Sequence, residues 1–308
     1  MSTTEANTRA VIAALIQEEA LPKDFAGPAL RFLAPLADQL AQRHQETDKT
    51  LVVGISGAQG TGKSTLAKCL ARLLDARQGL RALCLSLDDF YLTKTRRQHL
   101  AQHSHPMLAV RGVPGTHDVA LAVEILQRLC EAGATTLTAI PTFDKAVDDR
   151  LPAQRWPCFR GRPDVVLFEG WCVGARAVAD TELVVPCNDL ERERDAQGRW
   201  RHYVNSQLRD IYPALFAAIE VLLLLQAPDW DAVYRWRLLQ EDKLRHRCAE
   251  EGRDSHGVMD AAQIARFIQY YERVTRQCLR DLPAVADYLL PLDEDHRILG
   301  MHARCTTK

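Results

Sequence analysis

The chain has 308 residues, of which 47% are hydrophobic and 26% are charged. This composition is that of an ordinary globular protein, and it excludes a disordered, collagen-like or coiled-coil architecture. The 39 lysines and arginines balance 40 aspartates and glutamates, so the chain as a whole is not marked as a binder of nucleic acid or anionic membranes. Any charge that binds phosphate must be local.

Nine cysteines are scattered along the chain without a Cys-x-x-Cys pair or zinc-ligand spacing, which indicates reduced thiols. No stretch approaches the roughly 20 apolar residues of a membrane span. The first ten residues lack the basic-then-apolar pattern of a secretion signal. We therefore expect a cytoplasmic protein that has neither nucleic acid nor membrane as a partner.

Short apolar segments alternate with helical patterns along the chain. Two helices are expected within residues 8–46, and segment 51–55 is typical of a buried parallel strand. The other expected strands are 82–87, 164–168, 221–225 and 286–290, and the other expected helices are 64–74, 119–131, 230–250 and 261–280. This alternation predicts an α/β fold with a mostly parallel sheet covered on both faces.

Three segments lack this pattern. Residues 91–115 and 144–161 show little periodicity and are predicted to be long functional loops. The polar run 187–201 is predicted to be a surface insertion. No break in composition marks a domain boundary.

The strongest motif is the segment 57–64, Gly-Ala-Gln-Gly-Thr-Gly-Lys-Ser, which fits G-x-x-x-x-G-K-[ST] between a strand and a helix. Glycines let successive N–H groups point at one phosphate, and the positive end of the next helix adds to the field. Lys63 would reach the β- and γ-phosphates of a nucleoside triphosphate, and the Ser64 hydroxyl would bind Mg²⁺, but the motif alone does not separate a kinase from a GTPase or an ATPase. The alternative is a glycine-rich turn that only caps a helix. The predicted nucleotide-binding residues are Gly57, Ala58, Gln59, Gly60, Thr61, Gly62, Lys63, Ser64 and Thr65.

Acidic residues end two of the expected strands. Asp88 and Asp89 follow strand 82–87, at the sheet edge where open α/β sheets bind ligands. Phosphoryl transfer to an alcohol needs a group that accepts the hydroxyl proton, and we favour Asp88 as that base, with a turn or helix-cap role as the alternative. Glu169 ends an apolar strand in the Walker B manner and is expected to meet Mg²⁺, for which Asp88 is a further candidate ligand.

With these motifs the chain resembles the P-loop kinases of the uridine kinase, phosphoribulokinase and pantothenate kinase superfamily, and within it the plant-type D-glycerate 3-kinases. The segments that carry the resemblance are 57–64, 86–92, 111–118, 141–145, 168–171 and 236–241. The resemblance implies a three-layer P-loop NTPase fold with a helical lid, and it too places the base at Asp88. The resemblance covers about residues 50–298. We therefore expect two parts: an N-terminal helical extension, residues 1–48, and a kinase domain, residues 49–308, on which the extension packs.

The resemblance also indicates where the acceptor and the lid lie. The expected acceptor residues are Tyr91, Arg111, His117, Asp118 and Lys145, although each alone is more often a surface charge, and His117 could be structural. Helix 230–250 is expected to be the lid, with Arg237 as the best candidate to neutralise developing charge. Its other cations are Arg235, Lys243, Arg245 and Arg247. The alternative is a solvated helix whose charges pair along its surface.

These observations predict an enzyme that uses ATP and Mg²⁺ to phosphorylate a small hydroxy acid, by resemblance D-glycerate to 3-phosphoglycerate. One alternative keeps the reaction and changes the acceptor to pantothenate, a nucleoside or another sugar acid. A second alternative is a nucleotide-hydrolysing switch or chaperone. If it were a GTPase, an Asn-Lys-x-Asp signature would be expected, and the chain has none. A third is a nucleotide-binding module without catalysis, which should have lost Asp88 or Glu169.

Overall fold

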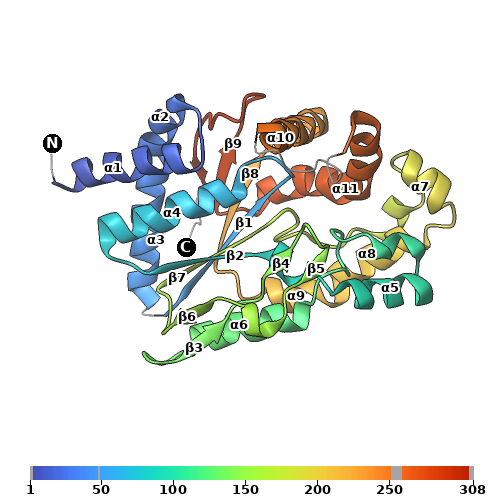
Figure 1. Ribbon diagram of the computed structural model, residues 1–308, viewed down its shortest axis with the longest axis horizontal. Coiled ribbons are helices and arrows are strands. Elements are labelled where there is room, and N and C mark those ends of the chain that lie inside the picture. The colour runs from blue at the N-terminus through green and yellow to red at the C-terminus, as the bar shows by residue number, and fades with distance from the viewer. Residues whose placement is uncertain (1–2, 48, 251–258, 305–308) are drawn as a thin grey trace.

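A six-stranded sheet forms the centre of the computed structural model, which describes residues 3–47, 49–250 and 259–304 (Figure 1). The strand order is β10-β9-β8-β1-β7-β2, with β10 as the single antiparallel edge strand. The strands are β1 (Leu51–Gly57), β2 (Ala82–Ser86), β7 (Val165–Gly170), β8 (Val221–Gln226), β9 (Tyr288–Pro291) and β10 (His302–Ala303). The mostly parallel sheet predicted from the apolar segments is confirmed.

Two hydrophobic cores lie on opposite faces of this sheet. Val53 and Ile55 of β1 belong to one core, and Val52 of the same strand belongs to the other. Because successive side chains of a strand point to opposite faces, a strand buried on both sides needs a continuous apolar run. This requirement explains why β1 and β7 are buried along their whole length.

Helices cover both faces and complete a three-layer fold (Figure 1). One face carries α1 (Thr3–Glu18), α3 (Ala34–Thr47) and α4 (Lys63–Gln78), with the short α2 (Ala26–Pro28) between the first two. The other face carries α6 (Val119–Cys130), α8 (Arg199–Asp210) and α9 (Tyr212–Phe216). Two long helices that pack on each other, α10 (Trp230–Glu250) and α11 (Ala261–Asp281), precede the last strands.

Polar contacts also hold the first helices to the helix that follows β1. Arg77 of α4 donates from Nε to Oδ1 of Asp38 in α3 over 2.9 Å, and from Nη1 to Oγ1 of Thr8 in α1 over 2.8 Å. Asn7 donates to the carbonyl of Ala76 over 3.0 Å. The N-terminal helices therefore sit directly on the element that begins at Lys63.

The prediction of an irregular loop over residues 91–115 is wrong, because α5 (Lys94–His103) lies within it. This helix is strongly polar, and Arg97 is its one buried residue in the described structure. The sequence therefore shows no apolar periodicity from which the helix could be predicted. Its start is instead fixed by Thr93, whose side chain accepts a hydrogen bond from the N–H of Arg96 over 3.3 Å.

Two further loop predictions need correction. Residues 187–201 are not a surface insertion, since they contain α7 (Asp189–Arg194) and the start of α8, with Glu191 and Trp200 buried. Arg273 of α11 pairs with Glu191 and so compensates for the burial of this charge. The stretch 144–161 contains short antiparallel strands: β4 (Phe143–Asp144) pairs with β5 (Asp149–Arg150), and β6 (Cys158–Arg160) pairs with β3 (Leu137–Ala139).

The described residues contain no helix that is both long and apolar enough to cross a membrane. The seven cysteines whose side chains the structure describes are free thiols.

Candidate active site

The loop that follows β1 has a backbone that only glycine adopts readily. Gly60 and Gly62 have φ angles of +83° and +86°. A Cβ at Gly60 would also lie 2.8 Å from the Cβ of Trp236 in α10. Within the loop, the side chains of Thr61 and Lys63 donate to the carbonyl of Ala58 over 2.9 and 3.0 Å. The loop is therefore a compact turn held between β1 and α10.

Helix α4 begins directly after this turn, at Lys63. Its N-cap is Gly62, which has no side chain to satisfy the first N–H groups of the helix. Free N–H groups and the positive end of the helix dipole make such a terminus suited to anions. The sequence pattern and the local geometry thus point to the same phosphate site.

Ser64 and Glu169 meet because α4 follows β1, and β1 is the neighbour of β7, the strand that carries Glu169. In the parallel pairing of β7, Glu169 lies beside Ile55 of β1 on one side and Ser86 of β2 on the other. The Ser64 hydroxyl donates to Oε1 of Glu169 over 2.7 Å. A hydroxyl and a carboxylate are hard oxygen ligands that suit Mg²⁺.

The described residues hold no cluster of three or more histidines, cysteines or acids that could bind a metal alone. Mg²⁺ commonly takes one or two protein oxygens and completes its shell with water and substrate phosphates. The pair formed by Ser64 and Glu169 fits that mode of binding.

Asp88 lies on the same edge of the sheet and is held by two donors. The Tyr91 hydroxyl donates to its Oδ1 over 2.8 Å, and Nζ of Lys145 donates to its Oδ2 over 2.7 Å. Burial pushes the pKa of Asp88 up, but the charge of Lys145 and these two hydrogen bonds outweigh it and leave the pKa below its usual value. Asp88 is therefore a carboxylate at neutral pH.

The neighbouring acid, Asp89, has a different environment. Its Oδ1 accepts a hydrogen bond from the N–H of Phe143 over 3.1 Å, which anchors strand β4. Burial raises the pKa of Asp89 to about 6, and Asp88 beside it acts in the same direction. Asp89 thus fixes the segment that carries Lys145.

A cavity of about 390 Å³ gathers most of the predicted site residues. The predicted residues that line it are Gln59, Gly60, Lys63, Ser64, Asp88, Tyr91, Arg111, Lys145, Glu169 and Arg237. Five further residues line it that the sequence did not single out for this site: Trp171, Gln240, Glu241, Phe267 and Tyr271. Trp171 could have been found, because it follows directly on the Glu169 strand, whereas Tyr271 lies in an amphipathic helix with no motif.

Arg111 enters the cavity from the loop before α6. Its guanidinium pairs with Asp148 and lies 5.5 Å from the centre of the Phe143 ring. Its carbonyl accepts a hydrogen bond from the Tyr271 hydroxyl over 3.1 Å. The next residue, Gly112, has a φ of +135°, and a Cβ there would overlap with Tyr271. Close packing of this loop against α11 therefore sets the position of Arg111.

Arg237 lies on the face of α10 that lines the cavity. It pairs with Glu241 one turn later and lies 5.8 Å from the centre of the Phe267 ring. The pair is nearly closed to solvent, with side-chain exposures of 16% and 5%. Arg235 and Arg245 instead pair with Glu294 and Asp242 at exposed positions. The side chains of Lys243 and Arg247 lie outside the described residues.

Two predicted acceptor residues are not among the described residues that line this cavity. His117 is buried, its Nδ1 lies 2.5 Å from the Tyr212 hydroxyl, and its ring stacks on Tyr91 with centroids 4.5 Å apart. Asp118 pairs with Arg96 and Arg150 at 2.6 and 3.1 Å. His117 therefore lies behind Tyr91 relative to the cavity.

A second cavity, of about 550 Å³, lies along the same glycine loop. Gly60 and Gln240 line both cavities, whereas Thr61, Gly62 and Thr65 line the second one. Most of its other lining residues come from residues 21–33, from α10 and from residues 292–298, which follow β9. The glycine loop thus separates two neighbouring hollows.

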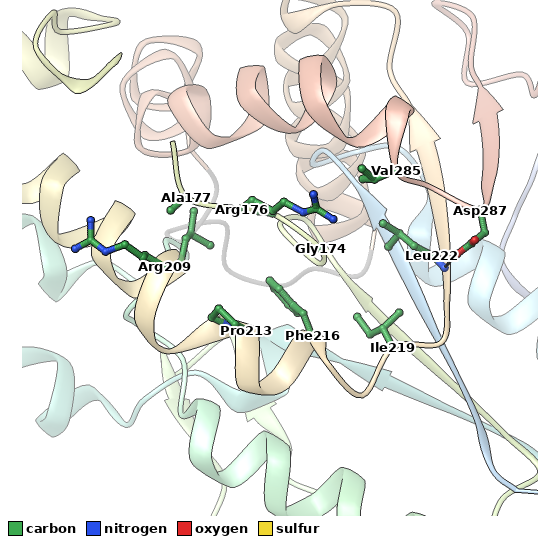
Figure 2. A pocket seen from close by; sticks show the side chains of 12 residues that line it. Gly174, Arg176, Ala177, Arg209, Pro213, Phe216, Ile219, Leu222, Val285 and Asp287 are labelled. Carbon is green, nitrogen blue, oxygen red and sulfur yellow. Dashed lines mark hydrogen bonds between the residues drawn. The ribbon is translucent and has the colours of Figure 1, made fainter. Parts of the chain in front are cut away.

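A third cavity, of about 530 Å³, lies elsewhere in the molecule (Figure 2). Leu222 near the start of β8 and Asp287 just before β9 line it, so it lies by the amino ends of these strands. No predicted site residue lines it. Because ligands of open α/β sheets bind at the carboxyl ends of the strands, this cavity is a poorer candidate for the active site.

The chain is similar to several known kinases. It is 32% identical over 245 residues to an uncharacterized kinase, mug58, of Schizosaccharomyces pombe, covering 75% of this chain and 82% of that protein. It is 31% identical over 247 residues to the chloroplastic D-glycerate 3-kinase of Arabidopsis thaliana, covering 78% of this chain but only 48% of the plant protein.

A solved structure agrees with these matches. The D-glycerate 3-kinase of Cryptococcus neoformans superposes with a TM-score of 0.71 at 26% identity, covering 88% of this chain and 97% of that one. No protein-family model matches the chain.

The buried histidine makes a testable contribution to the pH dependence of stability. Burial lowers the pKa of His117 to about 4, whereas the unfolded chain binds this proton near pH 6.5. Neutral His117 therefore makes its full contribution to the free energy of unfolding above pH 6.5. This contribution is lost as the pH falls from 6.5 towards 4, because the unfolded chain then binds a proton that the folded protein does not. Between pH 7 and pH 5 the expected loss is about 2 kcal/mol.

We expect His117→Gln to remove this part of the pH dependence, measured as the free energy of unfolding in urea at the two pH values. The matched control is the exposed His99→Gln, which should keep the wild-type difference. An unchanged difference in His117→Gln would show that the pKa of His117 is about the same in the folded and unfolded chain, which would contradict the lowering by burial.

Proposed function

We infer that this chain, which belongs to the P-loop kinase family of the Schizosaccharomyces pombe and Arabidopsis thaliana relatives, phosphorylates a small hydroxy acid. The chain is an ATP-dependent kinase, and the acceptor that we propose is D-glycerate, with 3-phosphoglycerate as the product. One observation carries the proposal: Lys63, the Ser64–Glu169 pair and Asp88 all face a single cavity.

The phosphate end of the cavity is formed by the glycine loop and the start of α4. Burial lowers the pKa of Lys63, whereas Glu169 and Asp88 act in the opposite direction. The phosphates of ATP would add further negative charge and so favour the cationic form of Lys63. Mg²⁺ held by Ser64 and Glu169 would neutralise charge on the β- and γ-phosphates.

The acceptor end is formed by Asp88 and the cations around it. As a carboxylate, Asp88 can accept the proton of the attacking hydroxyl and orient its oxygen towards the γ-phosphate. Arg111 and Lys145 line the same cavity, and both can bind a carboxylate. In the structure both cations are paired with acids, Asp148 and Asp88. We infer that the carboxylate of the acceptor takes over Lys145 and so frees Asp88 for the hydroxyl.

The walls of the cavity favour a small acidic acceptor. About 390 Å³ must hold both the transferred phosphoryl group and the acceptor. Trp171 and Tyr271 limit this space, and the Trp171 indole is fixed by donating to the carbonyl of Gly112 over 2.9 Å. The two cations favour a sugar acid over a neutral nucleoside. Arg237 lines the same cavity, and its charge would stabilise charge that develops on the phosphoryl group.

A panel of acceptors tests the proposal. We expect the rate of ADP release from ATP and Mg²⁺ to rise at least tenfold when D-glycerate is added, because the hydroxy acid replaces water as the acceptor. L-glycerate, pantothenate and uridine serve as matched comparisons. The same rate with all of them as with ATP alone would contradict a hydroxy-acid kinase, and stimulation by pantothenate alone would assign a different acceptor.

A pair of neighbouring variants tests the choice of base. Removing a general base costs about 10²- to 10⁴-fold in rate, so we expect Asp88→Asn to lower kcat by that factor. The Kd for ADP should stay within about twofold of the wild type, since Asp88 faces the acceptor. The matched control Asp89→Asn, which keeps an acceptor for the Phe143 N–H, should retain most of the turnover. The reverse pattern would make Asp89 the base.

A further inference from the structure

We propose that the segment of residues 21–33, which precedes the kinase core in sequence, forms one wall of the site that binds the adenine ring of ATP. The proposal rests on the proposed function in one respect, because it takes the phosphates of ATP to lie on the glycine loop. It assigns a binding role to a segment that the sequence motifs leave without one.

The second cavity lies where a nucleotide bound along the glycine loop would continue beyond its phosphates. Gly60 and Gln240 border both cavities, so a nucleotide whose terminal phosphate lies near Lys63 can pass along the loop from one to the other. Gly60 lies against Trp236, which lines the second cavity but not the first. Since the first cavity must hold the acceptor, the second is the neighbouring space left for the nucleoside.

The walls of the second cavity suit a flat aromatic ring. Phe25, Pro28 and Leu33 come from the N-terminal segment, and Trp236 and Ile298 come from α10 and the residues beyond β9. The indole of Trp236 is itself stacked on the ring of His296, with centroids 4.1 Å apart. Aromatic and aliphatic side chains bind the faces of a planar ring through dispersion and burial of apolar surface.

Polar groups at the rim can meet the edge of the ring. Nε of Arg297 donates to Oδ2 of Asp24 over 3.0 Å, and Nη1 of Arg297 donates to Asp295 over 3.0 Å. All three residues line the cavity. Carboxylate oxygens can accept hydrogen bonds from an exocyclic amino group such as that of adenine. The ion pair also joins the N-terminal segment to the residues beyond β9, across the cavity.

The N-terminal segment is anchored independently of any ligand. Ala29 and Leu33 are fully buried in the same hydrophobic core as Leu66 and Leu70 of α4. Phe25, in contrast, is only partly buried and lines the cavity. Shortening Phe25 should therefore alter the wall of the cavity while the segment stays in place.

The test is calorimetric titration of the full-length chain with ADP and, separately, with inorganic tripolyphosphate, which lacks a base. We expect Phe25→Ala to weaken ADP binding on the order of tenfold, as loss of an aromatic contact to a base does. Binding of tripolyphosphate should stay unchanged. The matched control is Phe32→Ala, in the same segment but outside the described lining of either cavity, and it should bind ADP as the wild type does.

Leu21→Ala, a second variant of the same wall, should reproduce the effect if Phe25→Ala does not fold. Wild-type affinity for ADP in the folded variants, or an equal loss for ADP and tripolyphosphate, would overturn the proposal. Neither titration contains an acceptor. A failure of D-glycerate to be phosphorylated would thus contradict the proposed function and leave this result intact.

Discussion

The hydrogen bond from Ser64 to Glu169 joins the first turn of α4 to the end of β7. It can form because β7 is paired in parallel with β1 on one side and with β2 on the other. The same register brings Asp88, just beyond β2, to the edge of the sheet where the glycine loop begins. Parallel pairing of β1, β7 and β2 therefore sets the relative positions of the glycine loop and both acids.

Three cations that line the first cavity each pair with an acid. Lys145 pairs with Asp88, Arg111 with Asp148 and Arg237 with Glu241. The Arg237–Glu241 pair is nearly closed to solvent, where a charge without a partner would be costly. Under the proposed function, an anionic substrate would replace an acid as the partner of one of these cations.

The sequence predicted the parts of the site that follow from local rules. The spacing of Gly57 to Ser64 and the acids at strand ends need only a strand followed by a turn, and the parallel sheet then brings them together. Tyr271 could not be predicted, because its place in the cavity depends on how α11 packs against Gly112. His117 lies in the segment 111–118, which predicts acceptor binding, yet tertiary packing places it behind Tyr91. The roles of the site residues, the division of the chain after residue 48 and a cytoplasmic location stay predictions.

We propose that the glycine loop and Asp88 hold the two reactants on either side of one transferred phosphoryl group. A crystal structure with ADP, Mg²⁺ and D-glycerate measures this directly. We predict the ADP phosphates at the N-terminus of α4 and a glycerate hydroxyl oxygen within hydrogen-bond distance, about 2.5–3.0 Å, of an Asp88 carboxylate oxygen. Glycerate bound away from Asp88, or phosphates bound away from Lys63 and Ser64, would contradict the account.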